Sequence, residues 1–189
     1  MAFLDESQSD RRDDPDTYML GAGVCAPGHD VDEVRDAMRG LKLKSEPKLH
    51  WRDAVEKRQE QIITALADLP ITHMVVVRAG LPGERPERQR RLCLERMLSE
   101  LVSLEVQTAI FESRGPADDR RDRDMLGHLR AQKRLSASLR MEHLAGPREP
   151  ALWAADVLCG AVTADRTGNP DHLAALQAAA RVTVVQLEA

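Results

Sequence analysis

Apolar runs of strand length alternate with longer stretches of helical periodicity, and this alternation constrains the fold more than any other feature of the sequence. The run ITHMVVVRAG (71–80) is compact and β-branched, as expected of a buried strand. Residues 2–6 and 17–27 predict two earlier strands, and the polar loop between them, which contains Pro15, makes a hairpin. Further strands are expected at 106–113, 138–144 and 181–188.

Amphipathic stretches separate these strands. Apolar residues at helical spacing predict helices over 30–43, 52–69, 86–105, 118–134, 151–165 and 171–180. The short stretch PKLHW (47–51) is predicted as one more strand. An early antiparallel hairpin followed by strands that alternate with helices indicates an α/β fold with a mixed sheet flanked by helices. A length of 189 residues favours one domain over 1–189.

The composition is that of an ordinary globular protein, with 42% apolar and 31% charged residues. No apolar run approaches the roughly 20 residues needed to cross a bilayer, and the N-terminus lacks the features of a signal peptide. Three widely spaced cysteines predict neither disulfides nor zinc. We therefore expect a cytoplasmic protein without membrane contact. The net charge is −4, but Arg-rich stretches at 84–97 and 120–134 could be solvated helix faces or a local track for phosphates.

Two acids follow apolar strand residues. Asp5 comes after the first apolar run, and Glu112 closes the run TAIFE. In open α/β sheets, ligands bind beyond the carboxyl ends of the strands. If these two strands are parallel neighbours, Asp5 and Glu112 converge there. The alternative is that Asp5, Glu6 and Glu112 are surface acids at strand ends, and Glu142 could replace Glu112 as the converging acid.

A third acid, Asp156, interrupts the most apolar helix of the chain, ALWAADVLCGAV. A buried carboxylate is costly unless it has a partner or a metal ion. The small residues Ala155 and Gly160 would let this helix approach a sheet closely. Three converging acids repel one another, and Mg²⁺ or Mn²⁺, which prefer hard oxygen ligands, would relieve that repulsion and support attack on a phosphodiester. The alternative is a structural ion pair of Asp156 with Arg148 or Arg166.

The segment KLHWRD (48–53) carries polar side chains that could accompany such a site. Lys48, His50 and Arg52 are candidates to bind a nucleic-acid backbone. His50 could also protonate a leaving oxygen, or it could simply pack beside Trp51. The sequence contains no phosphate-binding glycine loop and no nucleophile elbow, so other common chemistries are not indicated.

Two stretches resemble a known family. FLDESQSD followed by YMLGAGV is similar to the N-terminal signature of the domain-of-unknown-function 3800 family, and LWAADVLCGAV is similar to its C-terminal stretch. The resemblance implies a ribonuclease H-like fold with a metal-dependent nuclease site. The matching motifs imply that Asp5 and Asp156 are site residues, with Glu6 as the next best supported. Glu112 is not part of a matching motif and is proposed only from its place at a strand end. Gln8 stands where the family usually has glycine.

These observations lead to two hypotheses. The first is a ribonuclease H-like nuclease that cleaves DNA or RNA, with catalytic acids Asp5, Glu6, Glu112 and Asp156 and a Mg²⁺ or Mn²⁺ ion held by Asp5, Glu112 and Asp156. The second is a catalytically inactive module of the same fold that binds protein or nucleic acid, with a link to a mobile genetic element as one variant. A homodimer could form through the apolar helices after residue 150.

Overall fold

The computed structural model describes residues 1–136 and 138–188 and contains one mixed sheet with helices on both faces. The strands are β1 (Ala2–Gln8), β2 (Thr17–Cys25), β3 (Ile71–Ala79), β4 (Thr108–Glu112), β5 (Arg140–Leu144) and β6 (Val182–Leu187). The helices are α1 (Val31–Leu41), α2 (Glu56–Ala67), α3 (Pro86–Ser103), α4 (Pro116–Ala131), α5 (Leu152–Arg166) and α6 (Asp171–Ala179). Two short 3₁₀ turns, η1 (Trp51–Asp53) and η2 (Gly146–Arg148), complete the set.

The six strands lie in the order β5-β4-β1-β2-β3-β6. β1 and β2 form the expected antiparallel hairpin, and β2 also pairs antiparallel with β3. β4 pairs parallel with β1, β5 with β4 and β6 with β3, so β2 runs against the other five strands. The carboxyl ends of β1 and β4, which carry the first two candidate acids, therefore lie side by side.

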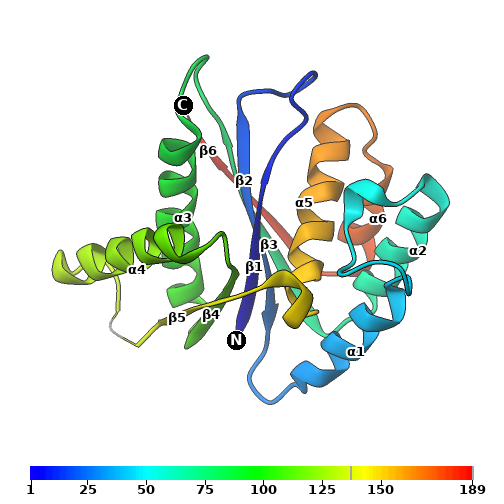
Figure 1. Ribbon diagram of the computed structural model, residues 1–189, viewed down its shortest axis with the longest axis horizontal. Coiled ribbons are helices and arrows are strands. Elements are labelled where there is room, and N and C mark those ends of the chain that lie inside the picture. Colours follow the sequence, from blue (N-terminus) through cyan, green and yellow to red (C-terminus); the bar gives the residue numbers. More distant parts are fainter. Residues whose placement is uncertain (137, 189) are drawn as a thin grey trace.

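The helices form two layers around this sheet. α3 and α4 cover one face, and α1, α2, α5 and α6 cover the other (Figure 1). Alternation along the strands supplies a core to each layer, because Phe3 and Met19 face the four-helix side whereas Leu4 and Leu20 face α3 and α4. The sequence-based expectation of an α/β fold with a mixed sheet flanked by helices is confirmed.

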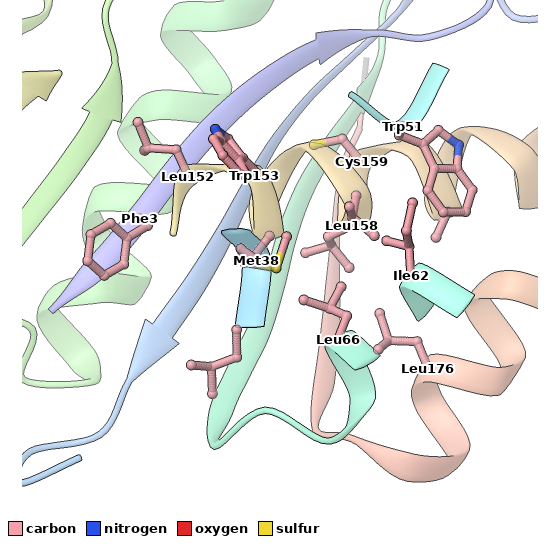
Figure 2. Packing of buried hydrophobic residues seen from close by; sticks show 14 of the residues in the cluster. Phe3, Met38, Trp51, Ile62, Leu66, Leu152, Trp153, Leu158, Cys159 and Leu176 are labelled. Carbon is pink, nitrogen blue, oxygen red and sulfur yellow. The ribbon is translucent and has the colours of Figure 1, made fainter. Parts of the chain in front are cut away.

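The core on the four-helix side is built around α5. Leu158 of α5 packs with Ile62 and Leu66 of α2 and with Leu176 of α6 (Figure 2). Burying each such side chain contributes about 1.5–3 kcal/mol. α5 is apolar on nearly all sides because the sheet contacts it on one side and α2 and α6 on the other.

Two expectations about element boundaries are wrong. β1 does not end near residue 6 but continues to Gln8, because β2 pairs with it along its whole length. The stretch 47–51 is not a strand; it is a loop that leads into η1. The backbone N–H of Trp51 donates to Asp156 of α5, so this segment is attached to a helix and not to a sheet edge.

Gly21 of β2 sets how closely α5 approaches the sheet. A Cβ atom at this position would lie 2.8 Å from Sγ of Cys159 and 2.9 Å from the backbone oxygen of Ala155. Gly21 also pairs directly with Asp5 in the β1–β2 ladder. Because Gly21 has no side chain, α5 packs closely against the strands next to Asp5. The helix residue in this close contact, Ala155, directly precedes Asp156.

His73 of β3 is fully buried on the four-helix side of the sheet. Burial disfavours the imidazolium and lowers the pKa of His73 to about 4. A histidine whose pKa is depressed in the folded state binds a proton more readily when unfolded, so its contribution to stability is lost as the pH falls from about 6.5 towards 4.

Replacing this residue, in His73→Leu, should remove that pH dependence. Between pH 7 and pH 5 the wild type should lose about 2 kcal/mol more unfolding free energy than the variant, at about 1.4 kcal/mol per pH unit below 6.5. Urea unfolding at both pH values measures the difference. Equal losses in the two proteins would show that folding does not depress the pKa of His73.

Candidate functional site

Asp5 and Glu112 meet on the four-helix face of the sheet. The β1–β4 ladder ends at the pair Leu4 and Phe111, and each acid is the next residue of its strand. Side chains two residues apart on a strand point to the same face of the sheet. Asp5 follows Phe3 by two residues and Glu112 follows Ile110 by two, so both acids project towards α5. The predicted convergence of these two acids on parallel neighbouring strands is what the structure contains.

Asp156 of α5 joins them from above the sheet. Its Oδ2 accepts the backbone N–H of Trp51 at 2.8 Å and lies 3.6 Å from Nδ1 of His50. The side chain is 15% exposed, and no ion pair joins it to Arg148 or Arg166 within the described part of the chain. Arg166 pairs instead with Asp14 at 2.6 Å, so the structural ion pair considered for Asp156 is absent from the described residues.

The three carboxylates act on one another electrostatically. The pKa of Asp5 is raised well above its ordinary value, first by burial and then by the negative charges of Glu112 and Asp156. The pKa of Asp156 is also raised, mainly by burial, with Glu112 contributing in the same direction. Glu142, the alternative third acid, is exposed on β5 and is not among the groups that act on Asp5. Glu112 is therefore the third member of the cluster, which we call the acidic cluster (Asp5, Glu112 and Asp156).

Lys48 is the cation nearest to this cluster in the part of the chain that the structure describes. Its Nζ donates to both carboxylate oxygens of Glu112, at 2.7 and 2.9 Å. Burial alone would lower the pKa of Lys48, but the bond to Glu112 and the charges of Asp5 and Asp156 outweigh burial and raise it. Lys48 is thus a charged partner of the acids. The sequence-based expectation was that it would bind a nucleic-acid backbone.

Glu6 lies outside the acidic cluster. Its neighbour Asp5 faces α5, so Glu6 faces α3 and α4, where it accepts from Arg90 at 2.7 Å and pairs with Arg114 at 3.2 Å. Arg90 also binds the buried Asp122 of α4. The expected catalytic role of Glu6 is not supported by this geometry, because two guanidinium groups already neutralise it on the opposite face.

The segment around Trp51 is anchored on α5. The indole ring lies where a side chain of Gly160 would be, since a Cβ there would fall 2.1–2.6 Å from ring atoms. The ring also meets the edge of His172 with centroids 5.1 Å apart. This packing, together with the bond to Asp156, holds Lys48 and His50 over the acids.

A groove runs along the open side of the acidic cluster. Its first part, about 310 Å³, is lined by Asp5, Lys48, Arg11 and Asp156 among others, and the adjoining part, about 210 Å³, continues along α5 towards Thr167. His50 and Arg52 line both parts. Asp5 and Asp156 are therefore accessible to a ligand, and the exposed Arg11 and Arg52 lie beside them.

The donor atoms suit a hard divalent cation, but the metal centre is not formed as it stands. Within residues 1–136 and 138–188, no group of three or more His, Cys, Asp or Glu side chains is placed to hold a metal ion. Both oxygens of Glu112 are taken by Lys48. Asp5 and Asp156 are free of ion pairs with lysine or arginine among the described residues.

Sequence reasoning missed two features of the site. Gly146 of η2 packs against the carboxylate of Glu112, because a Cβ there would lie 2.4 Å from Oε1. Arg11, at the tip of the β1–β2 hairpin, lines the groove. Neither position carries a sequence signal of its own, since a glycine in a turn and an arginine in a loop are both common.

Comparison with known proteins identifies the fold. The structure of the PCNA:RNase HII complex from Archaeoglobus fulgidus contains a chain similar to this one, with a TM-score of 0.52 and 16% identity over 94% of this chain and 75% of that chain. The ribonuclease H2 from Pyrococcus horikoshii OT3 aligns with a TM-score of 0.48 and 18% identity over 88% of this chain and 74% of that one. The first of these establishes a ribonuclease H-like fold. No family profile and no curated protein sequence matches the chain.

Two further expectations concern membranes and assembly. Among the helices that the structure describes, none has the length and apolar character needed to cross a bilayer. α5, the apolar helix proposed as a dimer face, is buried within the chain between the sheet and the other helices. The apolar residues of α5 thus pack inside the chain, and a dimer through the helices after residue 150 stays a prediction.

Removing one charge from the acidic cluster should stabilise the metal-free protein. The raised pKa of Asp5 means that stability is lost as the pH rises through the range between its unfolded and folded pKa values. Asp5→Asn keeps an oxygen to accept the N–H of Glu6, which lies 2.8 Å from Oδ1, and removes the repulsion. In EDTA at pH 7, its melting temperature should exceed that of the wild type.

A matched control is Asp13→Asn, which makes the same change in the exposed hairpin loop. Its melting temperature should equal that of the wild type within error. A lower melting temperature for Asp5→Asn than for Asp13→Asn would contradict the electrostatic account of the cluster.

Proposed function

We propose that the protein is a divalent-metal-dependent nuclease that hydrolyses phosphodiester bonds of DNA or RNA. The observation that carries this proposal is the convergence of Asp5, Glu112 and Asp156, from three separate parts of the chain, beside an open groove. Buried like charges are costly, so proteins keep them close together mainly where function requires it. The ribonuclease H-like fold is compatible with this chemistry but does not by itself establish it.

Asp5 and Asp156 are the residues that would hold a Mg²⁺ or Mn²⁺ ion, with Glu112 joining once Lys48 has released it. Bound there, the cation would supply an activated water and charge stabilisation for the leaving oxygen. The Trp51 N–H orients Asp156, and the N–H of Glu6 orients Asp5, so both carboxylates are held in place before any ligand arrives. His50 is 41% exposed at the rim of the groove and could exchange a proton with the leaving oxygen.

The groove supports a polyanionic substrate. Arg52 and Arg11 are exposed and line it, and within residues 1–136 and 138–188 neither forms an ion pair with the acidic cluster. Basic side chains beside a carboxylate site attract a phosphate backbone, and such binding weakens steeply with salt. Trp51 is 7% exposed and packed on Gly160, so it offers no stacking surface for bases. Arg52 keeps its role as a backbone contact in this proposal, and Lys48 does not.

We also propose that the chain is a member of the domain-of-unknown-function 3800 family. The stretches FLDESQSD and LWAADVLCGAV support this, because they supply Asp5 and Asp156, the two acids with no lysine or arginine partner among the described residues. Gln8 departs from the usual glycine of the first stretch. In this chain Gln8 is the last residue of β1 and pairs regularly with Tyr18 of β2.

A second candidate is the inactive module of the same fold. The bond between Lys48 and Glu112 favours it, because a neutralised acid needs no metal ion. Under this alternative the acidic cluster is a structural ion-pair site, and the groove binds a partner without cleaving it. The two candidates differ in what a substitution of Asp5 does to activity, which the following experiment measures.

Substitution of the acids should abolish cleavage. With Mn²⁺ or Mg²⁺ and end-labelled DNA and RNA, the wild type should cleave, and Asp5→Asn and Asp156→Asn should each lower the rate at least about 100-fold, because several kcal/mol of metal-derived stabilisation is lost. Glu142→Gln, in the exposed alternative acid, should cleave like the wild type.

Chelation by EDTA should stop the wild-type reaction. A rate that survives Asp5→Asn undiminished, or that persists in EDTA, would exclude the proposed chemistry. Absence of cleavage in the wild type with both metals and both nucleic acids would favour the inactive module.

A further inference from the structure

Lys48 is the positively charged partner of the acidic cluster and contacts one of its three acids directly. Its Nζ binds Glu112 through both oxygens, and its charge also acts on Asp5 and Asp156. The Lys48 and Glu112 side chains are 20% and 19% exposed, so solvent screens the pair only in part. Both residues thus belong to a partly buried cluster in which one ammonium faces three carboxylates.

The fold fixes both ends of this ion pair. Leu49 is fully buried and Trp51 is held in the space left by Gly160, so the backbone on the C-terminal side of Lys48 is anchored. On the other side, the carboxylate of Glu112 is packed against Gly146. The pair can therefore open by rotation of the lysine side chain towards the groove that it lines, without movement of the backbone.

We infer that the Lys48 ammonium is a built-in competitor of the divalent cation: it holds the acidic cluster closed when no metal ion is bound and must leave Glu112 before a metal ion gains its third ligand. This inference rests on the proposed function. Because Nζ occupies both oxygens of Glu112, a metal ion that bound Glu112 would displace at least one of these hydrogen bonds and would be repelled by the ammonium at such short distance. The lysine thereby lowers the affinity for metal ions and makes the complete site depend on their concentration.

Removing the ammonium should tighten metal binding. Isothermal titration calorimetry with Mn²⁺ alone should show that Lys48→Met binds at least about tenfold more tightly than the wild type. Lys44→Met is the matched control, because Lys44 lies exposed four residues earlier and the substitution changes the net charge equally. Its affinity should stay within about twofold of the wild type. Equal or weaker binding by Lys48→Met would overturn the inference.

A second variant keeps the test decisive if Lys48→Met fails to fold. Lys48→Arg keeps the positive charge and can still bind both oxygens of Glu112. It should bind Mn²⁺ no more tightly than the wild type, and Mn²⁺ should raise its melting temperature by no more than it raises that of the wild type. Tighter binding by Lys48→Arg would overturn the inference, because the competing charge is still present.

Failure of this inference can be told apart from failure of the proposed function. If Lys48→Met binds Mn²⁺ more tightly but no variant cleaves nucleic acid, the competitor role stands and the nuclease proposal falls. If the wild type cleaves and Lys48→Met binds Mn²⁺ no more tightly, the nuclease proposal stands and the competitor role falls.

Discussion

The close approach of α5 to the β1–β2 hairpin is the constraint on which the candidate site depends. Gly21 makes it possible, since any side chain there would collide with Ala155 and Cys159. The approach brings Asp156 over the sheet next to Asp5, while the parallel pairing of β1 and β4 brings Glu112 to the same place. Three acids far apart in sequence thus share one partly buried position, and their mutual repulsion must be offset.

The sheet divides the charged residues into two systems. On the α3–α4 face, Glu6 and Asp122 are matched by Arg90 and Arg114, as expected of a structural network. On the α5 face the acidic cluster has Lys48 as its only lysine or arginine partner among the described residues. The first system is balanced and closed, whereas the second is short of positive charge and opens on a groove. The second is therefore the functional candidate.

Much of the fold follows from local patterns, but the assignment of partners does not. The β-branched run of β3 and the apolar periodicity of α3 were sufficient to predict them. The carboxylates Asp5 and Asp156 were also predictable, because each breaks an apolar run. Glu6 points to the opposite face of the sheet from Asp5. Which helices cover that face depends on packing between segments that are distant in sequence, so the arginine partners of Glu6 could not be predicted. The pairing of Lys48 with Glu112 depends on how Trp51 docks against Gly160, which the sequence alone does not reveal.

The central claim is that Asp5, Glu112 and Asp156 repel one another at a single point in the folded chain. A ¹³C NMR titration of the Asp5 carboxylate in metal-free protein tests it most directly. We expect the pKa of Asp5 to lie well above the ordinary range of about 3.5–3.9 and to fall in Glu112→Gln, because burial and the Glu112 charge both raise it. A pKa for Asp5 within that ordinary range, unchanged by Glu112→Gln, would contradict the account.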